Sequence, residues 1–271
     1  MRLAFRVSYI GTDFAGSQQQ PGERTVCGEI LDAIRGLNLI SDADDDACAR
    51  FRFSGRTDRG VSARHQIAAF DTDFPERAIS KINQKLPADI TFTGYAEVDA
   101  DFNPRYAVKT RTYRYYFPII AEGEYDIKAM RDCAALFAGE HDFTAFSRSS
   151  ERSPVREVIS SEIFADADGG FLVYEIRGYS FVWNQVRCIA FALDAAGRGD
   201  LSVADVKLAL ENPEKFGRRF PAAEPEGLIL WDTECGIEFT PMPENKKSTL
   251  LAGSLIRRYS RLKKTAEIWN K

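Results

Sequence analysis

Residues 50–73 read RFRFSGRTDRGVSARHQIAAFDTD, and in this stretch a short polar loop separates two strand-like segments. The first segment spans residues 50–54 and the second spans residues 66–73. Gly55 and Gly60 bracket the loop, where glycine permits backbone angles and close approaches that a Cβ atom forbids. The stretch therefore predicts two strands joined by a structured loop.

The apolar pattern on either side of this stretch predicts the elements that flank it. Alternation predicts strands over residues 3–9 and 90–98, whereas helical spacing predicts helices over residues 26–37 and 76–86. Thr25 is placed to cap the first of these helices. The first part of the chain thus has the order strand, helix, strand, strand, helix, strand.

The same order of elements recurs in the second part of the chain. Strands are predicted over residues 110–119, 155–165, 171–178 and 227–232, and helices are predicted over residues 126–139, 183–196 and from Ser202. Two such units predict an α+β fold of two ferredoxin-like (split βαβ, RRM-like) halves. We expect a mostly antiparallel central sheet with helices on one face and an RNA-binding cleft on the other.

The predicted boundaries follow from this repeat of topology. We expect an N-terminal half over residues 1–105, a C-terminal half over residues 106–240 and a basic C-terminal tail over residues 241–271. For the tail, a contribution to RNA binding and a plain solvated terminus both stay open.

The composition is typical of a globular chain, with 44% hydrophobic and 28% charged residues. No apolar run approaches the length of a membrane span, and the N-terminus lacks the pattern of a signal peptide. The 5 cysteines are scattered without a C-x-x-C pair, and there are only 2 histidines. This usage predicts a reducing cytoplasm and neither a disulfide framework nor a metal site.

The formal net charge of −4 is unevenly distributed. Residues 42–46 form an acidic run, whereas basic residues cluster at positions 109–114, 148–156, 218–219 and 246–264. An acidic protein can therefore still present a basic cleft to RNA. Ordinary solvated surface charge remains the alternative for any single cluster.

Asp58 lies at the centre of the polar loop, between Arg56 and Arg59. A carboxylate beside fixed positive charge stays ionised and can be oriented by a guanidinium, which suits a nucleophile. The same residues are also common in turns. Taken alone, the loop fits a structural turn better than an active site.

The strand at residues 110–119 carries a possible surface for stacking bases. Arg111, Tyr113, Tyr115 and Phe117 share one face because side chains alternate along a strand. A base could stack on Tyr113, with phosphates held by Arg111 and Arg114. For the two rings further along the strand, burial in the core is the alternative.

Several separated motifs together resemble those of the TruA-type tRNA pseudouridine synthases. They are Tyr9–Gly16, Gly55–Val61, Asp101–Arg105, Arg111–Tyr115, Asp142–Phe146, Val186–Arg187 and Glu226–Leu228. The motifs occur in the family's order and extend along almost the whole chain.

The resemblance implies a role for particular side chains. Asp58 corresponds to the catalytic nucleophile and Arg187 to the arginine that pairs with it. Tyr113 corresponds to the tyrosine that stacks on the target uracil, and Arg56 to the arginine that helps to extrude the nucleotide. We also expect substrate contacts from a wider set of residues, namely Gly55, Thr57, Gly60, Arg111 and Arg114.

The resemblance also implies a reaction and its partners. The family isomerises uridine to pseudouridine in tRNA, here expected at positions 38–40 of the anticodon stem-loop, without a cofactor or a metal. It acts as a homodimer whose two subunits form basic clefts for the tRNA. The carboxylate could attack C1′ of the ribose or C6 of the flipped-out base, and Tyr113 is a candidate base for the proton on C5.

The chain departs from the family pattern at Ser17, Ser62 and Gln185, where tryptophan, histidine and methionine are usual. These departures leave room for a non-catalytic RNA-binding protein, which would not need Asp58 and Arg187 to lie close enough to pair. A weaker alternative is an enzyme acting on a free nucleotide, whose binding would depend only weakly on salt.

Overall fold

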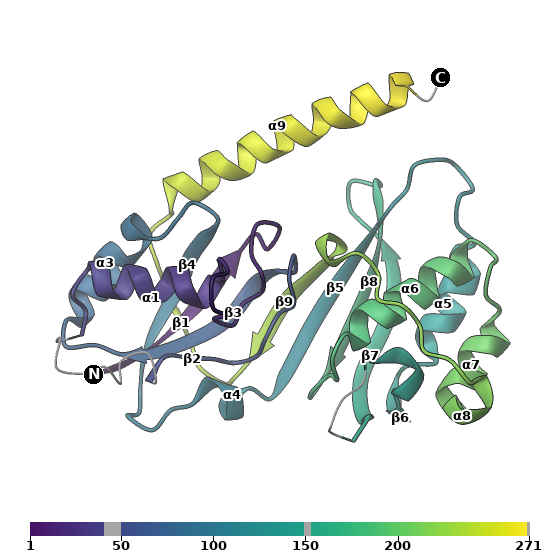
Figure 1. Ribbon diagram of the computed structural model, residues 1–271, viewed down its shortest axis with the longest axis horizontal. Coiled ribbons are helices and arrows are strands. Elements are labelled where there is room, and N and C mark those ends of the chain that lie inside the picture. Colours follow the sequence, from purple (N-terminus) through teal and green to yellow (C-terminus); the bar gives the residue numbers. More distant parts are fainter. Residues whose placement is uncertain (41–49, 149–152, 270–271) are drawn as a thin grey trace.

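The computed structural model describes residues 1–40, 50–148 and 153–269. Within these ranges ten strands form one continuous sheet (Figure 1). The acidic run at residues 42–46, for which we expect a loop, lies outside the described residues.

The first part of the chain forms four neighbouring strands and two long helices. Its elements are β1 (Arg2–Tyr9), α1 (Val26–Gly36), β2 (Arg52–Phe53), β3 (Ser62–Asp71), α3 (Pro75–Lys85) and β4 (Ile90–Val98). The strand order is β4-β1-β3, with β2 on the free edge of β3. The predicted cap of α1 is confirmed, because the Thr25 side chain accepts a hydrogen bond from the Gly28 amide.

The second part of the chain repeats this arrangement. Its elements are α4 (Pro104–Ala107), β5 (Thr110–Pro118), α5 (Ile127–Ala135), β6 (Gly139–Asp142), η1 (Thr144–Phe146), β7 (Val155–Ala165), β8 (Phe171–Gly178), α6 (Gln185–Gly197), α7 (Val203–Glu211), α8 (Pro213–Phe216), η2 (Pro225–Gly227) and β9 (Leu228–Glu234). The order β9-β5-β8-β7 matches that of the first part, with its fourth strand beside its first. The predicted α+β fold is therefore confirmed.

The two parts join through β3 and β9, whose pairing is parallel, whereas the other strand pairs of the described chain are antiparallel. Ser62 lies opposite Ile229, and Ala63 lies opposite Leu230. The strand β2 pairs only with Ala68 and Ala69 of β3, so the first residues of β3 are left for β9. The division of the chain at residue 105 stays a prediction.

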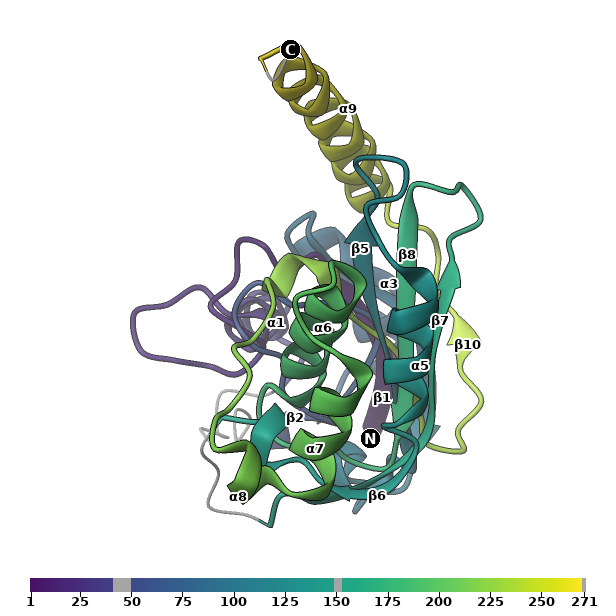
Figure 2. The ribbon, with the colours of Figure 1, turned by 90° about the vertical axis from the view of Figure 1, so that its right-hand side faces the viewer.

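Two hydrophobic cores form on the same side of the sheet. One lies between α1, α3 and the strands of the first part, and the other lies between α5, α6 and the strands of the second part. Leu228 and Leu230 of β9 belong to different cores, yet they share a face because they are two residues apart. Figure 2 accordingly shows α1 and α6 on the same side of the strands.

The position of the cleft differs from the sequence-based expectation. Tyr113 contacts both hydrophobic cores and so faces the helices rather than the opposite side of the sheet. The reason is the alternation along β5, which gives Tyr113 the same face as Tyr115 and Phe117, and the helices of the second part cover those two rings. Any site that includes Tyr113 therefore lies between the two groups of helices.

The range 241–271 is more ordered than the predicted tail. After β10 (Thr240–Pro241), which pairs with β4, the chain forms α9 (Lys246–Trp269), a helix of 24 residues. Asn245 caps its start, because its side chain accepts a hydrogen bond from the Lys247 amide at 3.2 Å, and the residues that follow are mostly good helix formers. In both views α9 rises clear of the rest of the molecule (Figures 1 and 2).

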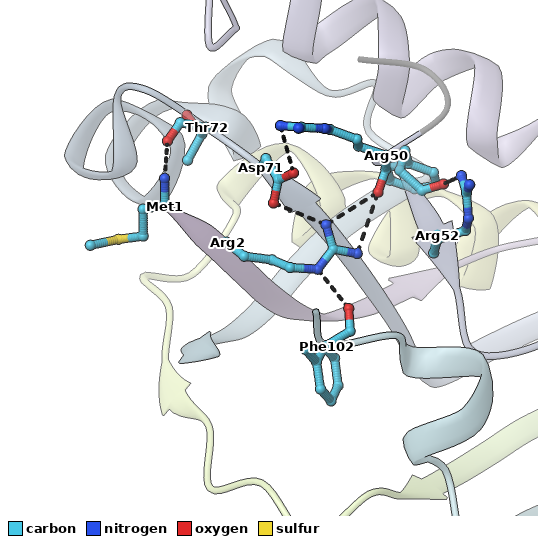
Figure 3. Close-up of polar contacts among 8 residues, drawn as sticks. Met1, Arg2, Arg50, Arg52, Asp71, Thr72 and Phe102 are labelled. Atoms are coloured by element: carbon cyan, nitrogen blue, oxygen red, sulfur yellow. Dashed lines mark hydrogen bonds and ion pairs between the residues drawn. The ribbon is translucent and has the colours of Figure 1, made fainter. Parts of the chain in front are cut away.

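A buried arginine connects β1 to the segments around it (Figure 3). Arg2 is 8% exposed, pairs with Asp71 of β3 at 3.0 Å and donates from Nε to the Phe102 carbonyl at 2.6 Å. Its two terminal nitrogens also donate to the Arg50 carbonyl. Arg2 therefore links β1, β3 and the segment that leads into the second part of the chain.

Replacing Arg2 by methionine should destabilise the fold by about 1–3 kcal/mol, because the Phe102 and Arg50 carbonyls lose a buried charged donor and Asp71 keeps only its ion pair with Arg50. Urea unfolding at neutral pH measures this change. The exposed Lys128→Met serves as the control, since its i,i+4 partner Asp132 is also on the surface. Equal free energies of unfolding for the two variants would contradict the structural role of Arg2.

Candidate active site

The polar loop after β2 is a tight turn that requires glycine. The Val61 amide donates to the Asp58 carbonyl at 3.2 Å, and Gly60 between them has a φ of +81°. A Cβ atom on Gly60 would lie 2.8 Å from the Pro225 ring. A turn over residues 58–61 is thus present, and Asp58 is its first residue.

Buried polar side chains hold the loop from below. Gln66, fully buried on β3, donates from Nε2 to the Gly55 carbonyl at 2.9 Å and accepts from the Ser54 hydroxyl. The Thr57 hydroxyl lies 2.8 Å from the hydroxyl of Tyr9 on β1. Since buried polar groups are costly to leave unpaired, these bonds specify one conformation of the loop.

Ser17 and Ser62, two of the three positions at which the chain departs from the family pattern, also form hydrogen bonds that hold the loop. Ser17 is buried, accepts from the Thr57 amide at 2.9 Å and donates its own amide to the Thr57 carbonyl. Ser62 accepts from the Gly11 amide at 2.9 Å. Gly11 approaches the loop so closely that a Cβ atom there would lie 2.1 Å from the Val61 carbonyl oxygen. Small side chains at both serine positions therefore fasten the loop.

Asp58 meets two side chains from the second part of the chain. Its Oδ2 lies 3.7 Å from Nη1 of Arg187, and its Oδ1 accepts from Nε1 of Trp183 at 3.2 Å. The Asp58 side chain is 32% exposed and the Arg187 side chain is 16% exposed. One carboxylate oxygen thus accepts a hydrogen bond and the other forms an ion pair, and the carboxylate remains open to a ligand.

The start of α6 orients Arg187. Its Nε donates to the Ala223 carbonyl at 2.7 Å, and its Nη1 donates to Oδ1 of Asn184 at 3.2 Å. Asn184 precedes the helix with a φ of +61°, a conformation that asparagine adopts more readily than most residues. Arg187 therefore lies in the first turn of α6, where the helix dipole also favours a nearby anion.

Opposing effects act on the protonation of Asp58. Burial raises the pKa of its carboxyl group, whereas the Arg187 charge and the Trp183 hydrogen bond lower it. Arg187 and Trp183 therefore counteract the cost of keeping a partly buried carboxylate ionised.

Tyr113 and Arg111 of β5 complete the surroundings of the loop. The Tyr113 ring packs edge-on against Phe181 with centroids 5.2 Å apart. Burial raises the pKa of Tyr113 to about 12, with a smaller contribution from the charge of Asp58. Arg111 donates to the carbonyls of Ser54 and Tyr179, each at 2.8 Å, and so connects the loop to the segment after β8.

The predicted site residues are not all brought together. Asp58, Tyr113, Arg187 and Arg111 converge, and Thr57, Gly55 and Gly60 shape the loop itself. Arg56 is exposed, so its guanidinium is accessible beside the loop. Arg114 points away on the opposite face of β5, where it pairs with Glu175 at 2.6 Å and stacks on Trp231.

Trp183 and the buried support of the loop were not recognised from the sequence. The sequence-based helix starts at Trp183, whereas α6 starts at Gln185. Asparagine is common at the N-cap of helices, so Asn184 could have moved the predicted helix start past Trp183 and left Trp183 in the loop. Nothing in the local sequence around Gln66 or Ser17 indicates contact with the loop, since those contacts depend on the tertiary fold.

Within the described ranges, the acidic, histidine and cysteine side chains form no cluster of three or more that could hold a metal ion. None of the helices in these ranges is long and apolar enough to cross a membrane.

Comparison with known proteins assigns the chain to a family. The sequence profile of a family described as "tRNA pseudouridine synthase" matches residues 133–234. A tRNA pseudouridine synthase A from Methanoculleus marisnigri is 50% identical over 243 residues, which cover 90% of this chain and 86% of the relative. The chain belongs to the tRNA pseudouridine synthase family. Its members are isomerases.

A second relative shows the same relationship. The tRNA pseudouridine synthase A of Methanosphaerula palustris is 43% identical over 257 residues, which cover 95% of this chain and 88% of the relative. Among solved structures, one chain of a Cbf5-Nop10-Gar1 complex aligns with 84% of this chain at 14% identity and a TM-score of 0.36, covering 49% of its own length. That likeness is too low to bear on the fold or the function of this synthase.

Replacing Trp183 by phenylalanine should shift the acid limb of the pH–rate profile to higher pH. The ring is kept but the donor to Asp58 is lost, so one of the effects that lower the Asp58 pKa disappears and ionisation requires a higher pH. We expect a small shift, since Trp183 is 58% exposed and its hydrogen bond is only one of the effects that lower the Asp58 pKa.

The matched control for this experiment is Trp231→Phe, because Trp231 stacks on Arg64 and Arg114 on the opposite side of the sheet. Isomerisation rates measured from about pH 5 to pH 9 should show a shifted acid limb in the Trp183 variant alone. Coinciding profiles for the native protein and both variants would refute a role of Trp183 in positioning Asp58.

Proposed function

We propose that the chain isomerises uridine to pseudouridine in the anticodon stem-loop of tRNA, with Asp58 as the nucleophile. The target nucleotide is flipped out of the stack, Tyr113 stacks on its uracil, and Arg56 assists its extrusion. The pairing of Asp58 with Arg187 at 3.7 Å is the observation that carries this proposal. A non-catalytic RNA-binding protein would not require it.

The proposed reaction conserves the atoms of the nucleotide and needs no redox partner. The Asp58 carboxylate forms a covalent bond at C1′ of the ribose or at C6 of the base. The N1–C1′ bond breaks, the base rotates, and a C5–C1′ bond forms in its place. N1 gains a proton and C5 loses one, and Asp58 is released unchanged. An ionised and oriented carboxylate is the requirement for the first step.

The surroundings of Asp58 support this chemistry. Burial keeps the pKa of the Asp58 carboxyl above its ordinary value, and Arg187 and the Trp183 N–H limit this rise, so they favour the charged form that attacks. A pKa of about 12 keeps the Tyr113 phenol protonated near neutral pH, which supports its stacking role more than a role as general base. The partly open carboxylate leaves a path for the nucleotide.

The partners and compartment proposed for this reaction rest on the family. We infer that the protein acts as a homodimer in the cytoplasm, with tRNA contacting both subunits, as the resemblance implies. The two relatives described above are named for a tRNA substrate, which supports tRNA as the substrate of this chain.

Asp58→Asn should abolish the release of tritium from tRNA labelled at C5 of uridine, since the amide is a far weaker nucleophile than the carboxylate. Binding of tRNA should persist, because the loop keeps the hydrogen bonds of Thr57 and Gly55. Tritium release and a filter-binding titration measure the two properties on the same preparation.

The matched control is Asp13→Asn, which removes an exposed carboxylate outside the loop and should retain turnover. Tritium release by the Asp58 variant at the native rate would rule out the proposed nucleophile.

A further inference from the structure

The helix α9 is anchored at its first turn and unsupported beyond it. Lys247 donates from Nζ to the Gln84 carbonyl at 2.9 Å and to the Leu86 carbonyl, both at the C-terminal end of α3. None of the α9 residues is buried, and the helix rises clear of the molecule in Figures 1 and 2. A helix of 24 residues extends for about 36 Å, so most of its length is available to a partner.

The charge of α9 is opposite to that of the rest of the chain. The helix carries seven basic residues and one acidic residue, Glu267, which give it a charge of +6; the basic ones are Lys246, Lys247, Arg257, Arg258, Arg261, Lys263 and Lys264. Removing these from the 36 basic and 40 acidic residues of the whole chain leaves 29 and 39, a charge of −10. Positive charge is therefore concentrated on one projecting element.

Three basic residues in the second half of α9 share one face of the helix. Arg257, Arg261 and Lys264 follow one another at spacings of four and three residues, so they form a basic stripe along one face. All three side chains are exposed. Most apolar residues lie on the other side, at Leu251, Leu255, Tyr259, Leu262, Ala266 and Trp269, whereas the exposed Leu250 and Ile268 flank the basic stripe at its two ends. The basic stripe is thus a continuous row of guanidinium and ammonium groups facing solvent.

We propose that the basic stripe of α9 binds the phosphate backbone of tRNA, an inference that rests on the proposed function. The charge of the helix favours a polyanion, and guanidinium groups form strong bidentate contacts with phosphate. Pairing of α9 with the same helix of a second copy would place two charges of +6 side by side, which disfavours that arrangement. Without α9 the net charge of the chain is −10, so attraction of RNA would depend on the basic clusters of the remaining chain alone.

The test uses the full chain with the substitutions Arg257→Gln, Arg261→Gln and Lys264→Gln combined, since glutamine keeps a good helix propensity. The affinity for unmodified tRNA is measured from about 50 to 400 mM KCl. The logarithm of the affinity should fall less steeply with the logarithm of salt concentration, by about two to three units of slope, because three phosphate contacts are lost. At 50 mM salt the affinity should fall by at least about tenfold.

The matched control neutralises the same amount of charge elsewhere, with Lys128→Gln, Lys207→Gln and Lys215→Gln combined. These lysines are exposed on α5, α7 and α8. Their variant should keep the native slope and affinity. An equal loss in both variants would show an effect of net charge alone and overturn the proposal.

Other outcomes also decide the matter. An unchanged salt slope in the α9 variant overturns the proposal. Binding of the native protein to vesicles of anionic phospholipid would then identify a membrane surface as the partner of α9. Dissociation of a dimer by Leu255→Gln with Leu262→Gln would instead identify a second copy of the chain as the partner. A native protein that does not bind tRNA overturns it as well. If both variants bind tRNA with the expected salt slopes but the native protein releases no tritium from labelled tRNA, the role of α9 is supported and the proposed isomerase function is contradicted.

Discussion

The parallel pairing of β3 with β9 is the interaction on which the candidate site depends. It starts at Ser62, directly after the loop that carries Asp58, so the loop lies next to the second part of the chain. A two-residue β2 is what leaves that end of β3 unoccupied. Because Asp58 and Arg187 come from opposite sides of this junction, slippage of the pairing would separate them.

The support beneath the loop explains how one carboxylate can be both partly buried and oriented. Gln66, Tyr9 and Ser17 hold the backbone and hydroxyl groups on either side of Asp58, so the loop does not reorganise to satisfy them. Arg187 and Trp183 then contact one carboxylate oxygen each. Orientation is thus supplied by the first part of the chain and charge compensation by the second, which suits a site between two halves.

Local signals predicted much of the fold. Thr25 caps its helix as expected, and Asp126 and Ser202 cap the helices predicted to begin at them, because capping depends on residues only a few positions apart. The convergence of Asp58, Arg187 and Tyr113 was expected only from the resemblance to a family. Trp183 was missed, and the side of the sheet that carries the site was not anticipated, since both follow from the packing of distant segments.

The ionisation of Asp58 tests the account most directly, because it reports the contact across the junction without requiring turnover. The measurement is a ¹³C NMR titration of the Asp58 carboxyl group, assigned by comparison with Asp58→Asn, in the native protein and in Arg187→Met. Arg187 lowers the pKa of Asp58, so the account predicts a higher pKa in the Arg187 variant. An identical pKa in the two proteins would contradict it.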